Sequence, residues 1–310
     1  MKRNAIVRLC IWSIISLLLI RLFAAWMTGG VDFKSSLLPF GVTKYQYKNA
    51  DRYTAGNTEI SERVKSLDVN WISGSVSIIA WDGDTVRIRE DEDITDPDQQ
   101  VHWYLESGRL HIQYCASKRF QADLPSKDLI IELPVGWASN LSSIEIETVS
   151  ASVNLNDLDT RELQIESVSG GFNLVKVSAA DADLDTVSGH ISATDLNASI
   201  IDVETVSGTT TLSGWIGNGT FETGSGDVTL TSNGTPEALD LKTVSGNITL
   251  IYPLTGTILN EGFRVVLDTV SGDIKSELHY TKAGNNYSFG SGKHVYTFES
   301  VSGDLIVKEP

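Results

Sequence analysis

Apolar and polar residues alternate in short runs along most of this chain, and the alternation recurs with a nearly fixed period. The tetrapeptide Thr-Val-Ser-Gly, or a close variant, occurs eight times, with its serine at Ser150, Ser169, Ser188, Ser207, Ser225, Ser245, Ser271 and Ser302. The steps between these serines are 19, 19, 19, 18, 20, 26 and 31 residues. A period near 20 residues is typical of solenoid proteins, in which each unit stacks on the previous one.

Alignment of the eight copies on the serine gives columns of constant chemistry. The position four residues before the serine is always apolar, and the position two before it is always Thr or Ser. The position three before it carries Glu147, Glu166, Asp185, Glu204, Glu222, Lys242, Asp268 and Glu299. A period of two excludes a helix and predicts two short strands per unit, joined by a Ser-Gly bend. We expect the glycine to supply a positive φ and the hydroxyl groups to hydrogen-bond one another; Ala151 replaces the glycine in the first copy.

Two short strands cannot bury an apolar face alone, so the units must stack. The pattern predicts an all-β fold, a single-stranded parallel β-helix (β-solenoid) of about 19 residues per rung. We assign 64–310 to one repeat domain, with a less regular N-terminal part that caps the stack (64–135) and serial rungs over 141–310. The cap should hold strands at Val69–Trp71, Val76–Trp81 and Val86–Arg89, and a hairpin of Val101–Leu105 with Leu110–Tyr114. The longer late steps predict loops or hairpins around 252–263 and 280–296.

The residue pattern of the N-terminal region predicts that the chain is targeted to a membrane. Residues 9–27 are mostly apolar and carry one charge, Arg21, and three bases but no acid precede them. We therefore expect a cytoplasmic tail (1–8), a transmembrane signal-anchor (9–27) and an extracytoplasmic connector (28–63), which is either a stalk or the first strand and cap of the domain. A cleaved signal peptide is the alternative, although its site would place a bulky residue, Phe23, at the outer small-residue position.

The net charge limits the classes of partner, and the cysteine content limits the possible disulfide bonds. The chain has 24 Lys and Arg against 40 Asp and Glu, a formal net charge of −16, and four of the bases lie in the first 27 residues. So acidic a surface repels phosphate backbones, which excludes nucleic acid as a partner. The two cysteines, Cys10 and Cys115, form no disulfide framework.

The motifs for chemistry are weak. A polysaccharide lyase or hydrolase needs one singular pair of carboxylates, whereas the acidic column here recurs in almost every unit. The calcium-binding nonapeptide GGxGxD is absent, GSGK at 290–293 lacks the first glycine of a phosphate loop, and the five histidines show no metal-ligand spacing. We predict no catalytic residue, no metal site and no cofactor. The candidate binding face is the part of the acidic column formed by Glu147, Glu166, Asp185, Glu204 and Glu222. The alternative is that this column only keeps the protein soluble.

The segment Tyr45–Tyr53, the sequence WISGSVSI at 71–78 and the serial Thr-Val-Ser-Gly units together resemble a known family. It comprises bacterial envelope proteins with a "putative adhesin" β-strand-repeat domain of unknown function, some of them linked to the envelope stress response. The resemblance covers 45–310, implies a right-handed β-helix and supplies no catalytic residue. We expect a non-enzymatic binding or adhesion module in the bacterial cell membrane, single-pass with the C-terminal domain outside. Its expected partners are the membrane, through the N-terminal helix, and a cell-wall polymer, an envelope protein or a cationic peptide. The second hypothesis is a β-helix enzyme acting on polysaccharide.

Overall fold

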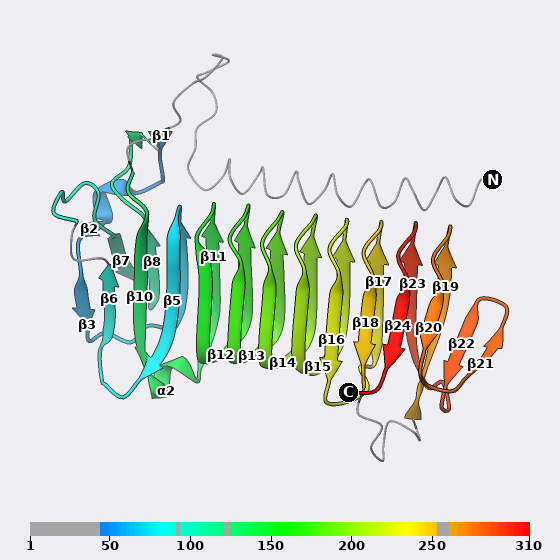
Figure 1. Ribbon diagram of the computed structural model, residues 1–310. Coiled ribbons are helices and arrows are strands. Elements are labelled where there is room, and N and C mark those ends of the chain that lie inside the picture. The colour runs from blue at the N-terminus through cyan, green and yellow to red at the C-terminus, as the bar shows by residue number, and fades with distance from the viewer. Residues whose placement is uncertain (1–43, 91–93, 121–123, 253–260) are drawn as a thin grey trace, which may run out of the picture. The chain divides into compact units, whose positions relative to one another are not determined.

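The computed structural model describes residues 44–90, 94–120, 124–252 and 261–310, and almost all of its elements are strands (Figure 1). The tail, the transmembrane signal-anchor and residues 28–43 of the connector predicted from the sequence lie outside these residues. Among the described residues, no helix has both the length and the apolar character needed to cross a membrane. The described chain forms two compact units, residues 44–170 and residues 171–310.

In both units each rung supplies a first strand and a second strand, which in most rungs are joined by the Ser-Gly bend. We call the two stacks of strands the first-strand layer and the second-strand layer. In the N-terminal unit the first-strand layer holds β4 (Ser66–Trp71), β8 (Arg109–Gln113), β11 (Leu141–Thr148) and the end of β12 (Ser152–Ser167). Ile146 is in parallel register with Ile165, 19 residues later, as the repeat predicts. The second-strand layer holds β5 (Gly74–Trp81), β10 (Lys127–Pro134) and the start of β12.

Antiparallel strands extend this unit. β7 (His102–Glu106) pairs with β8 and with β2 (Thr54–Ala55), and β6 (Val86–Glu90) pairs with β10 and with β3 (Thr58–Ile60). The hairpin predicted at Ser107-Gly108 is confirmed, and both turn residues have a positive φ, as a two-residue hairpin requires. β2 and β3 come from the predicted connector. The remaining short elements are β1 (Lys44–Tyr45), β9 (Arg119–Phe120), η2 (Ala50–Arg52) and α2 (Val135–Ala138).

The C-terminal unit continues the same repeat. β13 (Phe172–Thr186), β14 (Ile191–Thr205) and β15 (Thr210–Thr223) each bend from the second-strand layer into the first-strand layer. β17 (Ala238–Thr243), β19 (Phe263–Thr269) and β23 (His294–Ser300) extend the first-strand layer. The second-strand layer continues with β16 (Val228–Ser232), β18 (Ile248–Ile251), β20 (Ile274–Ser276) and β24 (Leu305–Lys308). The hairpin expected near 280–296 is confirmed as β21 (Tyr280–Ala283) with β22 (Asn286–Phe289), while most of the other expected loop, 253–260, lies outside the described residues.

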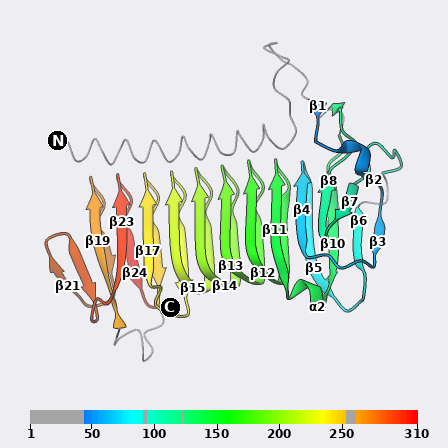
Figure 2. The same ribbon diagram turned by 180° about the vertical axis from the view of Figure 1, so that it is seen from behind.

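The expectation of serial rungs over 141–310 is wrong near the C-terminus. β23 pairs with β17 on one side and β19 on the other, so the last rung of the chain lies between two earlier ones (Figure 2). β24 likewise lies between β18 and β20. In the N-terminal unit the rung of β4 and β5 lies between that of β8 and β10 and that of β11 and β12. Parallel strands with equivalent columns pair equally well in either order, so the repeat alone does not fix the order.

The inward columns form the core, as the alternation predicts. The position four residues before the serine is buried in all eight copies: Ile146, Ile165, Leu184, Val203, Phe221, Leu241, Leu267 and Phe298. The position three after it is buried as well, including a polar residue, Thr210. Burial of these side chains in successive rungs gives each unit a continuous apolar interior, which stabilises the stack.

The structure gives the Thr-Val-Ser-Gly motif a different chemistry from the one expected. The Thr or Ser hydroxyl accepts a hydrogen bond from the glycine N–H three residues later, at 2.7–3.0 Å in seven copies. The serine hydroxyl donates to a carbonyl of the adjacent rung, as Ser302 does to Val244 and Ser271 does to Val301. The hydroxyl groups thus mainly satisfy backbone groups rather than one another.

The reason for the bend glycine is also different. None of the glycines that follow the motif serine has a positive φ. Instead, a Cβ on Gly208 would lie 1.8 Å from the carbonyl oxygen of Gly189, and one on Gly303 would lie 1.9 Å from that of Gly246. Close stacking of the bends, not a left-handed backbone, requires glycine here. Positive φ occurs at the opposite bend, at Asp157, Lys176, Asp195 and Gly214, again at intervals of 19 residues.

Candidate functional site

The predicted acidic column lies on the outer side of the first-strand layer. In the N-terminal unit Glu147 is in register with Glu166, and in the C-terminal unit Asp185 is in register with Glu204, which is in register with Glu222. The carboxylates are less exposed than a solvent-facing row would be, because Asp185 is 3% exposed and the other four are half-buried. Each unit therefore holds its acidic residues in a partly desolvated environment.

A second acidic column, which the sequence analysis missed, lies two residues earlier in each rung. It contains Glu145 and Asp68, in register in the N-terminal unit, and Asp183, in register with Asp202, in the C-terminal unit. Asp240 belongs to the same column. The alternation of period two contained the signal, since side chains two residues apart share a face of a strand.

Lys242 interrupts the acidic column in the C-terminal unit. Its Nζ lies 2.7 Å from Glu222 Oε1 and 2.7 Å from Asp240 Oδ2. Burial alone would lower the pKa of Lys242, but the hydrogen bonds to Asp240 and Glu222 outweigh burial and raise it. Burial and then Asp240 raise the pKa of Glu299 in the adjacent strand.

The acidic columns of the N-terminal unit form one side of a pocket of about 270 Å³. The segment 47–53, which contains η2, supplies Tyr47, Lys48, Asn49 and Tyr53 to the pocket. β7 supplies the third tyrosine, Tyr104. The layer contributes carboxylates, amides and an imidazole: Asp68, Asn70, His111, Gln113, Glu145 and Glu147.

Hydrogen bonds fix most polar groups of this pocket. His111 Nδ1 lies 2.7 Å from Asp68 Oδ2, and Asn70 donates to the other oxygen of Asp68 at 3.1 Å. Arg109 Nη2 lies 2.5 Å from Glu145 Oε2 and 3.6 Å from Asp68 Oδ2. The ring of Tyr104 stacks on His111, with the two centroids 4.4 Å apart. Asp68 and Glu145 therefore both have hydrogen-bonding partners within the protein.

Glu147 differs from these two carboxylates. It lines the pocket, yet it has no hydrogen bond or ion pair with any residue that the structure describes. Burial, followed by the negative charges of Glu166, Asp68 and Glu145, raises the pKa of Glu147 to about 7. Near neutral pH this carboxyl group exchanges a proton easily and is suited to a cationic partner.

The position of His111 in the sequence shows no spacing typical of a metal-ligand site. Its partner, Asp68, lies 43 residues earlier, and only the pairing of β4 with β8 brings the two into register. Tyr47 and Tyr53 lie in the connector, whose sequence fits either a stalk or the first strand and cap of the domain. A pocket built from four distant segments has no motif by which a sequence would reveal it.

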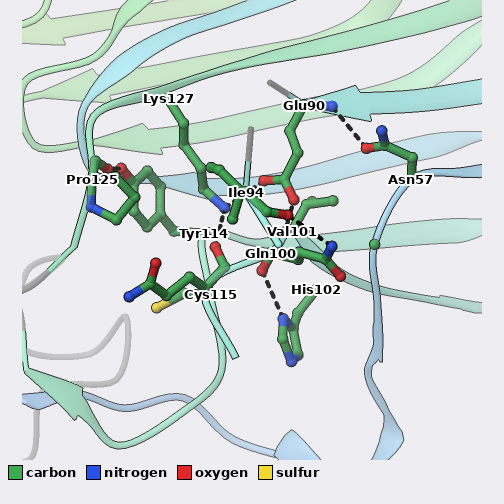
Figure 3. Close-up of polar contacts among 12 residues, drawn as sticks. Asn57, Glu90, Ile94, Gln100, Val101, His102, Tyr114, Cys115, Pro125 and Lys127 are labelled. Carbon is green, nitrogen blue, oxygen red and sulfur yellow. Dashed lines mark hydrogen bonds and ion pairs between the residues drawn. The ribbon is translucent and has the colours of Figure 1, made fainter. Parts of the chain in front are cut away.

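A buried ion pair lies elsewhere in the N-terminal unit (Figure 3). Lys127 is 1% exposed, and its Nζ lies 2.5 Å from Glu90 Oε2 and 2.6 Å from the Gln99 carbonyl oxygen. The Val101 N–H donates to the other Glu90 oxygen at 2.7 Å. The ammonium group also lies 4.9 Å and 4.6 Å from the ring centroids of Trp71 and Tyr114. These contacts hold residues 99–101 against β10, so the role of the ion pair is structural.

Other candidates are weaker. In the described part of the chain, no group of three or more His, Cys, Asp or Glu side chains is arranged to hold a metal ion. Cys115 is buried, and its thiol donates to the Ala116 carbonyl oxygen at 3.4 Å. A second, more apolar pocket of about 440 Å³ lies in the C-terminal unit, where Ile200 and Val295 are exposed beside Asp240 and Glu299.

Comparison with known proteins identifies the family of this chain. Residues 57–308 match the family described as Toastrack DUF4097. The chain belongs to this family. The Toastrack fold is β-solenoid-like, in agreement with the parallel rungs seen in each unit. A comparison with curated proteins finds no significant match.

Solved structures similar to this Toastrack chain share little sequence with it. One, described as a "putative lipid binding protein" from Parabacteroides distasonis, has 14% identity and a TM-score of 0.45, covering 83% of this chain and 97% of its own. A "putative adhesin" from Bacteroides fragilis has 12% identity and a TM-score of 0.43, covering 82% and 96%. A second "putative adhesin", from Parabacteroides distasonis, has 15% identity and a TM-score of 0.42, covering 82% and 96%. Similarity at this level assigns no ligand or activity.

Proposed function

We propose that this Toastrack protein is a non-enzymatic binding module of the adhesion type, which attracts cationic partners through its two acidic columns. It stands outside a bacterial membrane on the helix predicted at 9–27, and its rungs wind as a right-handed β-helix. The anchor, the location and a role in sensing envelope stress rest on the sequence alone. The binding role is supported by family membership and by the acidic face.

The observation that carries the proposal is the pairing of the columns. Asp183 and Asp202 are in register in one column, and Asp185 and Glu204 are in register in the next, so adjacent rungs hold four acidic residues on one face. Carboxylates stacked at the rung spacing of about 4.8 Å repel one another and give the face a strongly negative potential. A basic peptide segment relieves that repulsion, whereas a nucleic acid would increase it.

The test compares two triple variants of the full chain in detergent. D183N/D202N/E204Q removes three charges from the columns, and D159N/D195N/E237Q removes three exposed charges outside them. We expect the first variant to lose most of the affinity for a lysine-rich peptide and the second to keep it. Binding should also weaken steeply between low and moderate salt. Absence of binding by the unaltered protein, or equal loss in both variants, would refute the proposal.

The polysaccharide-enzyme hypothesis gains one specific observation. A carboxyl group with a raised pKa, Glu147, lies beside Asp68 and Glu145, and glycosidases use such unlike carboxyl groups as acid and base. Turnover of any member of a glycan panel, abolished in E147Q, would establish this function in place of the first.

Membrane topology has a separate test. The basic residues before the apolar segment place the N-terminus in the cytoplasm and the repeat domain outside. Alkaline phosphatase fused after residue 310 should therefore be active in bacteria. A well-expressed but inactive fusion would contradict the proposed location.

A further inference from the structure

We propose that the pocket lined by Tyr47, Tyr53 and Tyr104 binds a single amino-sugar unit, with its free ammonium group held against Glu147. The inference rests on the proposed function, because Glu147 belongs to the acidic face. It goes further by assigning a small ligand and a defined pocket rather than a diffuse attraction.

The dimensions and walls of the pocket favour one sugar ring. Its volume is about 270 Å³, at the lower end of the range for small-molecule sites and too small for a longer oligosaccharide. Tyr47 and Tyr53 offer ring surface to the C–H face of a sugar, whereas the ring of Tyr104 already contacts His111 and Arg52. Asn70 donates to Asp68 and Gln113 hydrogen-bonds Tyr53, so each amide has only its remaining donor and acceptor capacity for ring hydroxyl groups.

The charges of the pocket favour an amine on that ring. Arg109 and His111 satisfy Glu145 and Asp68, whereas no described residue satisfies Glu147. An ammonium group at Glu147 would form a charge-assisted hydrogen bond beside aromatic rings that also attract cations. A neutral sugar would leave the carboxyl group without a counter-charge, and an anionic sugar would be repelled.

Proton linkage gives the inference a further signature. The groups that face Glu147 are Glu166 from β12, Asp68 from β4, Glu145 on its own strand, His111 from β8 and Lys48 from the segment above the strands. Among them the acidic residues, together with burial, raise the pKa of Glu147 to about 7. A bound ammonium group favours the ionised carboxylate, so binding should release a proton and tighten as the pH rises from about 6 to 7. At higher pH it should weaken again, because the amine of the sugar then loses its own proton.

The experiment measures binding of D-glucosamine, N-acetyl-D-glucosamine and D-glucose to the full chain in detergent, by calorimetry at two pH values. We expect D-glucosamine to bind about tenfold more tightly than the other two sugars, with proton release, and E147Q to abolish that preference. E62Q is the matched control, because Glu62 is an exposed carboxylate in the same unit that belongs to neither acidic column and does not line this pocket. It should bind D-glucosamine as the unaltered protein does.

Three results would overturn the inference: equal affinity for the three sugars, an unchanged preference in folded E147Q, or tighter binding of Nα-acetyl-lysine amide, which would indicate a peptide side chain as the ligand. If E147Q does not fold, Tyr53→Leu and the sugar comparison on the unaltered protein still decide. D-glucosamine binding can succeed while the lysine-rich peptide test on the C-terminal columns fails, and the reverse holds as well. The two proposals therefore fail independently.

Discussion

Thr210 shows how a single atom limits the stability of a rung. Its side chain is 1% exposed, in an inward column between Ile191 and Val228, and its hydroxyl has no hydrogen-bond partner among the residues that the structure describes. Valine has nearly the same shape without the polar atom. We expect T210V to raise the free energy of unfolding by about 1 kcal/mol, measured by chemical denaturation.

Thr205 supplies the opposite control in the same rung. Its hydroxyl accepts the Gly208 N–H at 2.9 Å, and both groups are buried. T205V leaves that N–H without an acceptor and should cost about 1–3 kcal/mol. If both valine substitutions change stability in the same direction, the hydrogen-bond account of the motif is wrong.

Gly208 tests the stacking of the bends. An added Cβ would lie 1.8 Å from the Gly189 carbonyl oxygen, a backbone atom that moves only if the rungs separate. We expect G208A to lower the free energy of unfolding by more than about 3 kcal/mol. Gly136, where an added Cβ meets nothing within 4 Å, is the control, and G136A should change stability little. A melting temperature of G208A close to that of the unaltered protein would show that glycine is not required by close approach.

At the scale of elements, the strand of Lys127 depends on a buried ion pair. Lys127 occupies an inward position of β10, where Leu129 and Ile131 are the next inward residues. We expect K127M to cost about 3–5 kcal/mol, because it leaves the Glu90 carboxylate buried without its counter-charge. K127M/E90Q should recover much of that loss. Equal instability of the single and double variants would show that Lys127 acts through packing against Trp71 and Tyr114 alone.

The alternation of residues predicted most individual strands and the inward columns, because burial on one face of a strand directly constrains the sequence. It did not predict β10 or the pocket. β10 places a lysine at an inward position, which a hydrophobic pattern does not anticipate, and Glu90 lies 37 residues away. The pocket combines Tyr47, Asp68 and His111 from segments whose proximity depends on strand order. A pattern of period two reports the face of a residue but not the identity of the neighbouring strand.

At the scale of the molecule, strand order is where sequence and structure differ most. Within the C-terminal unit, the rung formed by β23 and β24 is the last in the chain but lies between two earlier rungs. The 26- and 31-residue steps that precede the last two motif serines provide the extra chain that such an order needs. Loop closure costs little more for a longer connection, so intercalation is thermodynamically accessible once the connections are long enough.

Truncation after residue 290 distinguishes an intercalated rung from a serial one. A serial stack would lose only its end rung, and residues 263–276 would remain paired with residues 238–251. In the structure the deletion removes β23 and β24, which join β19 and β20 to the rest of the unit, and leaves β19 paired only with β22. We therefore expect amide hydrogens in 263–276 to exchange much faster than in the unaltered protein, while those of β13 and β14 stay protected. Removal of residues 309–310, which lie beyond β24, is the control and should leave exchange unchanged. Persistent protection of 263–276 in the longer truncation would mean that these rungs pair directly and that the order described here is incorrect.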